Sequence, residues 1–321
     1  MKNMKQNKLA LSIGAMVLSS LVITTAHAAP IASAEAVVSF TDFTVNWLTG
    51  SKAGTQVDAS DFSSLSFTST QQTSANLPGF AGVSDLVSST VSAPLLAQSS
   101  LGTIDPSIIF ATATPTTIFN QVALPLVGNF SASESNETGA PITGLGVTAN
   151  ADINAASYAS LDTSNGVAGA GTTSVLSSQM TFVSGLNGNL RFNFDIDSYI
   201  AAFLTNGAAQ AATGSWSVGF SLQDITNPFA STLVGFYSVG DTVSNNAPGN
   251  GITNLGALNG AHTGLSFDSA LLNAGNKYSL TANITTTATA QRQQAVPEPA
   301  TLALLGIGLL GFGVMSRRTK K

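Results

Sequence analysis

The sequence of 321 residues predicts an all-β protein: an antiparallel β-sandwich (jelly-roll-like) ectodomain, with an N-terminal signal peptide and a C-terminal single transmembrane helix. Apolar and polar residues alternate with a period of two in several stretches, which is typical of strands with one buried face. Gly, Asn and Pro gather between these stretches as turn signals. Uncharged apolar runs lie near both ends of the chain, next to basic residues.

Four stretches show the alternation most clearly, and each is predicted to place one row of side chains in the core. Their other rows are mostly Ser, Thr, Asn and Asp, which suits a face turned to solvent. Trp216 and Tyr278 fall in the apolar rows, so we expect both to be buried. The predicted core rows are Phe43, Val45 and Trp47; Leu190, Phe192, Phe194 and Ile196; Gly214, Trp216, Val218, Phe220 and Leu222; and Tyr278, Leu280, Ala282 and Ile284.

Two segments do not fit the strand pattern. Ser198–Ala212 is the best candidate for an internal helix, although Asn206 and Gly207 interrupt it. Ser131–Pro141 is polar, and we expect a surface loop or a domain boundary there. The body, residues 29–291, is long enough for one large sandwich or for two smaller domains.

Composition excludes several classes of function. Only 8% of the residues are charged, against roughly a quarter in ordinary soluble domains. Residues 29–296 hold four basic and fifteen acidic residues, a net charge of −11, so we expect no binding to nucleic acid. The chain has no cysteine, which excludes disulfides, thiol catalysis and cysteine-based metal sites.

The first 28 residues have the three parts of a secretory signal peptide. Lys2, Lys5 and Lys8 precede an uncharged apolar run, and small residues follow it. We expect signal peptidase to cut after Ala28, with Ala26 and Ala28 before the cut and Ala29 after it. The sequence therefore predicts a chain that is handled by the export machinery.

The last residues are arranged as a second membrane signal. A short polar spacer, residues 292–295, leads to Pro297, Glu298 and Pro299, and residues 300–316 then carry no charge. Seventeen residues of helix span roughly 25 Å, near the short limit for crossing a bilayer. Arg317 and Arg318 begin a basic tail, residues 317–321, which is expected to stay on the cytoplasmic side.

Residues 296–321 resemble the PEP-CTERM sorting domain, because the Pro-Glu-Pro motif (297–299), the Gly-rich apolar helix (300–316) and the Arg-rich tail follow one another in the family's order. The resemblance implies a Gram-negative bacterium that makes exopolysaccharide. It also implies an exosortase that recognises Pro297, Glu298, Pro299, Arg317 and Arg318 and processes the chain near the motif. The inner membrane would then be a transient anchor, and the cell surface, outer membrane or extracellular matrix the destination.

No catalytic residues are predicted. Ser/His/Asp catalysis needs a positioned imidazole, and after signal removal only His262 remains, in what resembles an exposed turn. Asp195 and Asp197 share a strand face about 7 Å apart at Cα, a spacing that also suits glycoside hydrolysis. A bound calcium explains this pair better than catalysis does, with Asp224 or Asp241 as a further ligand; no other cofactor is expected.

The sequence thus favours a non-enzymatic cell-surface or matrix protein, sorted by an exosortase and associated with exopolysaccharide or biofilm. The alternative is a secreted protein with the same tail that binds or hydrolyses polysaccharide. Sugar sites often use exposed aromatic rings, for which Trp47, Tyr199 and Tyr237 are the remaining candidates.

Overall fold

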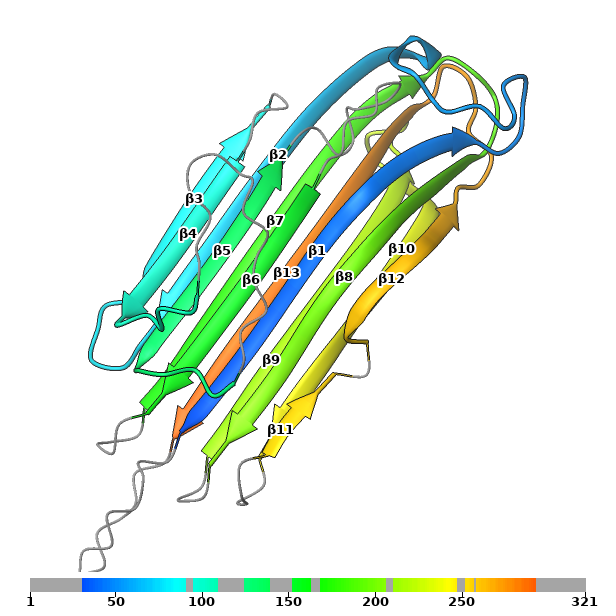
Figure 1. Cartoon of the computed structure of the whole chain (residues 1–321). Helices are drawn as coiled ribbons and strands as arrows, with labels where there is room; N and C mark the ends of the chain where they lie inside the picture. The colour runs from blue at the N-terminus through cyan, green and yellow to red at the C-terminus, as the bar shows by residue number, and fades with distance from the viewer. Residues whose placement is uncertain are drawn as a thin grey trace, which may run out of the picture.

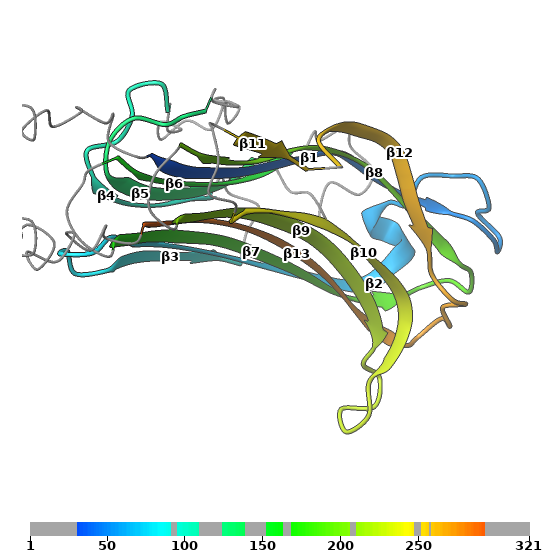
Figure 2. The same ribbon diagram turned by 90° about the horizontal axis from the view of Figure 1, so that it is seen from below.

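Two antiparallel sheets pack face to face in the computed structural model, which describes residues 31–90, 95–108, 124–138, 152–162, 168–205, 210–246, 252–256 and 258–292. Figure 2 shows the two layers edge-on. The predicted all-β sandwich is therefore confirmed. The signal peptide and the sorting tail lie outside the described residues.

Sheet A has seven strands in the order β11-β8-β1-β6-β5-β4, with β12 also paired to β8. Sheet B has six strands in the order β10-β9-β13-β7-β2-β3. Figure 1 shows both sheets as long, curved layers. The strands of sheet A are β1 (Ala32–Trp47), β4 (Leu95–Gly102), β5 (Phe130–Thr138), β6 (Asp152–Leu161), β8 (Leu190–Leu204), β11 (Ile252–Leu255) and β12 (Gly260–Asp268); those of sheet B are β2 (Phe62–Asn76), β3 (Val83–Ser89), β7 (Ala168–Ser184), β9 (Gln210–Asp224), β10 (Thr232–Asn245) and β13 (Lys277–Arg292); a short 3-10 helix, η1 (Ala59–Asp61), precedes β2.

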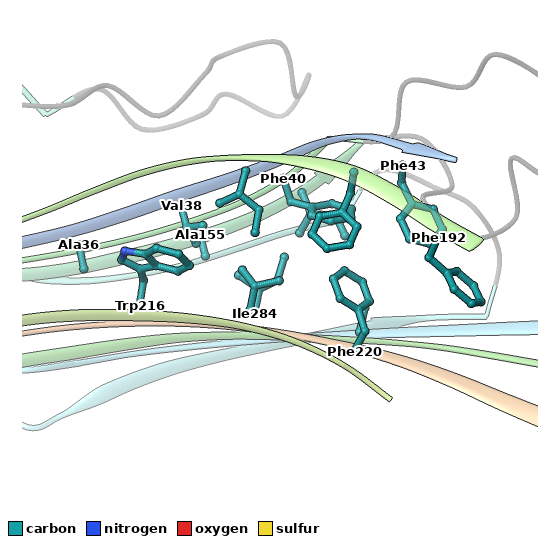
Figure 3. Close-up of a cluster of buried hydrophobic side chains, with 14 of the residues drawn as sticks. Ala36, Val38, Phe40, Phe43, Ala155, Phe192, Trp216, Phe220 and Ile284 are labelled. Carbon is teal, nitrogen blue, oxygen red and sulfur yellow. The ribbon is translucent and has the colours of Figure 1, made fainter. Parts of the chain in front are cut away.

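The inward side chains of β1 increase in size from one end of the sandwich to the other. Along β1 the inward residues run from Ala32 and Ala34 through Val38 to Phe40 and Phe43, all buried. Strand β13 runs in the opposite direction to β1, so its inward side chains become smaller along the strand, from Tyr278 to Ala290. The sheets diverge accordingly from Ala36 towards Phe192 in Figure 3. We call the Ala-rich end the narrow end and the aromatic end the wide end.

Phe220 of β9 is the centre of the aromatic cluster at the wide end. Its ring lies 4.9 Å from that of Phe194 and 5.4 Å from that of Phe40, measured between centroids, and 5.6 Å from that of Phe267. These distances fall in the range in which aromatic pairs attract one another beyond their area burial. Aromatic packing therefore joins both sheets here (Figure 3).

A hydrogen-bonded polar layer replaces the apolar core between β2 of sheet B and β4 and β5 of sheet A. Thr73 and Ser99 hydroxyls lie 2.9 Å apart, and the Gln71 amide hydrogen-bonds the Ser135 hydroxyl at 3.1 Å. Ser69 donates to the Glu137 carboxylate. Each such bond contributes roughly 0.5–1.5 kcal/mol net, and losing one partner costs more because the other stays buried.

The interpretation of Ser131–Pro141 as a surface loop or boundary is wrong over its described part. Residues 130–138 form β5, and those from Phe130 to Glu137 are buried on both faces. One face meets the polar layer, and the other packs with Ile108 and Leu126, which lie in the described parts of the connection from β4 to β5. Polar residues predict a surface position, whereas those of β5 are buried, and Ser135 and Glu137 form hydrogen bonds to β2.

The predicted helix at Ser198–Ala212 is also wrong. Strand β8 continues to Leu204, and β9 begins at Gln210. Ile200, Ala201 and Ala202 are all buried, because β8 is covered on both faces near its end. Apolar residues on both faces removed the two-residue alternation that identifies a half-exposed strand.

Both ends of the described chain lie at the narrow end. Ile31 and Thr205 are joined there by backbone and side-chain hydrogen bonds, and Arg292 closes β13 opposite Ala168 of β7. Figure 1 shows the chain entering β1 and leaving β13 at the same end of the sandwich. The sorting tail therefore continues from the narrow end.

Gly214 of β9 provides a test of the close approach at the narrow end. A Cβ at this position would lie 2.6 Å from the Glu35 backbone oxygen of β1. We expect Gly214→Ala to lower the free energy of unfolding by about 1–3 kcal/mol, because backbone must move to relieve the overlap.

Gly219→Ala on the same strand is the matched control. Its Cβ would lie no closer than 3.9 Å to the Tyr237 oxygen, so we expect no loss and a gain of up to about 1 kcal/mol. Chemical denaturation of both variants measures the difference. Equal stability of the two variants would contradict the proposed contact between sheets.

Candidate functional site

A hollow of about 320 Å³ lies on the outer face of sheet A, over β1, β6, β8 and β12. Sheet register explains its composition, since Asn154, Ser39, Asp197 and Ala261 lie side by side across the four strands. Asp195 pairs with Thr41 in the next row. The polar residues that line the hollow are Ser39, Thr41, Asn154, Asp195, Asp197 and Thr263.

The two carboxylates in the hollow have no basic partner among the described residues. Asp195 Oδ1 accepts a hydrogen bond from the Gly264 backbone N–H at 2.7 Å. Asp197 is exposed. The base on the same face of β8, Arg191, is held by Asp268 through bonds of 2.7 and 2.8 Å. The hollow therefore offers negative charge surrounded by uncharged oxygen atoms.

Asn154 is the most buried polar residue of the hollow, with 5% of its surface exposed. Its Oδ1 atom has no hydrogen-bond partner among the described residues. Burying an unpaired amide oxygen is unfavourable, because the oxygen loses its bonds to water without replacement. No pattern in the sequence singles out Asn154, because its place beside Ser39 and in the same hollow as Asp197 depends on the strand order β8-β1-β6.

The two further aspartates suggested for a metal site are engaged elsewhere. Asp224 accepts hydrogen bonds from Thr226 and from the Asn276 amide near the start of β13. Asp241 on β10 accepts from the backbone N–H groups of Thr242 and Leu258. Within the described ranges, no three His, Asp or Glu side chains come together in a way that could hold a metal ion.

His262 is not in an exposed turn, so that interpretation is wrong. It lies on β12 opposite Ile196, is partly buried, and its Nε2 is 2.8 Å from the Leu258 carbonyl oxygen. The ring borders an apolar pocket of about 200 Å³ between the sheets, next to Trp216 and Tyr237. Its neighbours there are core side chains.

The aromatic residues considered for sugar binding lie mainly inside the sandwich. Trp216 and Tyr278 are buried as predicted, and Trp47 is buried too. Tyr199 and Tyr237 are partly buried against the core clusters. All five therefore pack at least partly against the core.

The outer face of sheet B forms a broad surface of uncharged hydrogen-bonding groups. The exposed row of β2 includes Ser66, Thr68 and Gln72, while β9 contributes Ser217 and β13 contributes Asn283. We call this the hydroxyl face. It extends over neighbouring strands, because β9, β13, β7 and β2 are adjacent in the sheet.

Three glutamates that the sequence analysis did not identify are buried within sheet A. Glu35 and Glu134 lie on its outer side, and Glu137 faces the polar layer. Burial, followed by the charges of Glu35 and Glu134, raises the pKa of Tyr158 well above its ordinary value. The signal available in the sequence was the presence of three glutamates within stretches that form strands. Their burial depends on tertiary packing, which the sequence pattern does not show.

Asp61 at the wide end is another buried acid, and its partners stabilise its charged form. Burial alone raises the pKa of this carboxyl. Hydrogen bonds from Lys52, from Trp47 Nε1 at 2.8 Å and from the Asp58 backbone N–H outweigh burial and hold the pKa below its ordinary value. This cluster joins η1 to β1 and is structural.

Comparison with known proteins identifies the end of the chain. Residues 295–318 match the PEP-CTERM protein-sorting motif. The protein is therefore of the exported class that is sorted by exosortase. It carries the motif at its C-terminus, as the residues from Pro297 to Arg318 predicted. No curated protein matches the chain.

One solved structure in the comparison is described as "Structural basis for the promiscuous specificity of the carbohydrate-binding modules from the beta-sandwich super family". It is 7% identical in sequence, and the alignment covers 78% of this chain and 95% of that one. The TM-score of 0.10 is too low to support any conclusion about fold or ligand.

The residues predicted for cleavage, anchoring and sorting fall in two stretches, 1–30 and 293–321. Ala26, Ala28, Ala29, Pro297, Glu298, Pro299, Arg317 and Arg318 lie outside the described residues. Within the described part of the chain, no helix has the length and apolar character that crossing a bilayer requires.

The lowered pKa of Asp61 predicts a specific pH dependence of stability. A carboxyl with a depressed folded pKa stabilises the fold above its unfolded pKa of about 3.9, and this contribution is lost as pH falls through the folded value. We expect Asp61→Asn to lower the free energy of unfolding at pH 7 and to reduce its decline below about pH 4. Denaturation of both proteins between pH 2 and pH 7 measures this, and identical acid slopes would contradict it.

Proposed function

We propose that the chain is a non-enzymatic cell-surface or extracellular matrix protein of a Gram-negative bacterium, processed by exosortase near Pro297–Pro299 and associated with exopolysaccharide. The single observation that carries the proposal is the sorting motif at residues 295–318. Before processing, the segment 300–316 would hold the chain in the inner membrane, with Arg317 and Arg318 on the cytoplasmic side.

The attachment of the tail at the narrow end supports a positional role. Because β13 ends at Arg292 and β1 begins at Ala32 on the same end, the sandwich would extend away from its anchor lengthwise. The wide end and both outer faces would then be available to the surroundings. Processing would release this body without any change in its fold.

The hydroxyl face supports an association with polysaccharide. Hydroxyl and amide groups exchange hydrogen bonds readily with sugar hydroxyls, and the outward rows of β2 and β9 carry no charge that would need to be desolvated. A broad face of this kind favours many weak contacts with a polymer over one tight site. The rival proposal, a polysaccharide-hydrolysing enzyme, rests on Asp195 and Asp197 alone.

Mass spectrometry of the mature C-terminus tests the sorting proposal. In a host with exosortase we expect the chain to end at or near Pro297–Pro299, whereas without the enzyme it should retain residues 300–321. Replacing Pro297, Glu298 and Pro299 with Ala should also leave the tail intact. Replacement of Gln293 and Gln294 in the spacer is the matched control, and it should be processed normally. An intact tail in both hosts would contradict the proposal.

Cell fractionation tests the association with exopolysaccharide. We expect the mature protein in the matrix fraction of a producing strain and in the medium of a strain that makes no exopolysaccharide. An unchanged distribution would reject the association. Hydrolysis of the purified polymer by the full chain, abolished by Asp195→Asn, would establish the rival enzyme.

A further inference from the structure

We propose that the hollow on the outer face of sheet A is a calcium site in which Asp195 and Asp197 supply the charged ligands and Asn154 Oδ1 a neutral one. This goes beyond the proposed function, since nothing in sorting or matrix association requires a metal. It also changes the ligand set suggested by sequence, because Asp224 and Asp241 are bound to other groups.

The chemistry of the hollow selects a hard cation. Every polar side chain that lines it offers oxygen, and none is basic. Ca²⁺ takes six to eight oxygen ligands from carboxylates, amide carbonyls and water. The body's charge of −11 adds a general attraction for cations. An anionic ligand would be repelled by both carboxylates.

Strand geometry places the three ligands within reach of one ion. Asp195 and Asp197 point to the same face from positions two residues apart, about 7 Å between Cα atoms. Asn154 and Asp197 are separated only by Ser39, which puts their Cα atoms about 10 Å apart across two strand spacings. Oxygens on opposite sides of Ca²⁺ are about 5 Å apart, so the Asp197 and Asn154 side chains cover the remaining distance. Asp195 lies on the diagonal, about 12 Å from Asn154 at Cα, and its carboxylate joins the ion through a bridging water.

Asn154 is the independent observation that points to a ligand. Its side chain is more than nine-tenths buried and lines the hollow, and its Oδ1 has no partner in the described chain. A cation would satisfy this oxygen, which two carboxylates cannot do because they only accept hydrogen bonds. The volume of about 320 Å³ leaves room for waters to complete the coordination.

Two charged ligands and an open face predict a weak site. Its dissociation constant should be about 10⁻⁴–10⁻³ M, the range found in extracellular modules. Calcium is favoured over magnesium, because Mg²⁺ demands a compact octahedron and gives up its waters reluctantly. The ligands lie on two strands, β8 and β6, which β1 keeps apart, so they cannot move together to form that smaller shell.

Isothermal titration of CaCl₂ into the full chain, purified in detergent, tests the proposal. We expect one site with a dissociation constant near the millimolar range, weakened about tenfold or more in Asp197→Asn. Asp197 is exposed and makes no hydrogen bond within the described residues, so this variant should fold normally. Calcium should raise the melting temperature of the wild type and not that of the variant.

Asp42→Asn is the matched control. Asp42 is an exposed acid on β1, beside Thr41 but outside the hollow, and its φ of 56° is one that Asn adopts as readily as Asp. Removing the charge of Asp42 should change the calcium affinity less than twofold. No binding at 10 mM CaCl₂, unchanged affinity in Asp197→Asn, or an equal loss in Asp42→Asn would each overturn the proposal.

Discussion

The layer of side chains between the two sheets determines the shape of the whole molecule. Alanines of β1 and Gly214 of β9 allow close approach at the narrow end, and phenylalanines hold the sheets apart at the wide end. A core packs without large voids, so the separation of the sheets follows the size of the residues that fill it. Both ends of the described chain, Ile31 and Arg292, reach the narrow end because β1 and β13 have opposite directions and matching gradients.

In the polar layer of the interior, hydrogen bonds take the place of apolar packing between the two sheets. Between β2 of sheet B and β4 and β5 of sheet A, Ser, Thr and Gln side chains from opposite sheets pair across the layer. Such a layer gains little from the hydrophobic effect, but each missing partner would leave a buried polar group unsatisfied. The polar layer therefore fixes how the two sheets align with each other more than it adds to the free energy of unfolding. It also accounts for a composition rich in Ser and Thr and poor in charge.

The sequence predicted the strands with one exposed face and missed those that are covered on both. The rows from Leu190 to Ile196 and from Tyr278 to Ile284 alternate cleanly and are buried as expected. Alternation fails at Ile200–Ala202, where both faces of the strand carry apolar residues. It also fails at Phe130–Glu137, where polar residues, most of them small, occupy both faces. Of the candidate site, Asp195 and Asp197 were visible as a pair on one strand. Asn154 and Ser39 could not be found, because they join the hollow only through the order of the strands.

We infer that the polar half of the interior is as firmly closed as the aromatic half. Amide hydrogen exchange of the full chain, followed by mass spectrometry of its peptides, tests this most directly. We expect amides of β5 to exchange as slowly as those of β1, within about tenfold, because both open only when the sandwich unfolds as one unit. Exchange of β5 many orders of magnitude faster than that of β1 would contradict it, since the polar layer would then open independently of the aromatic core.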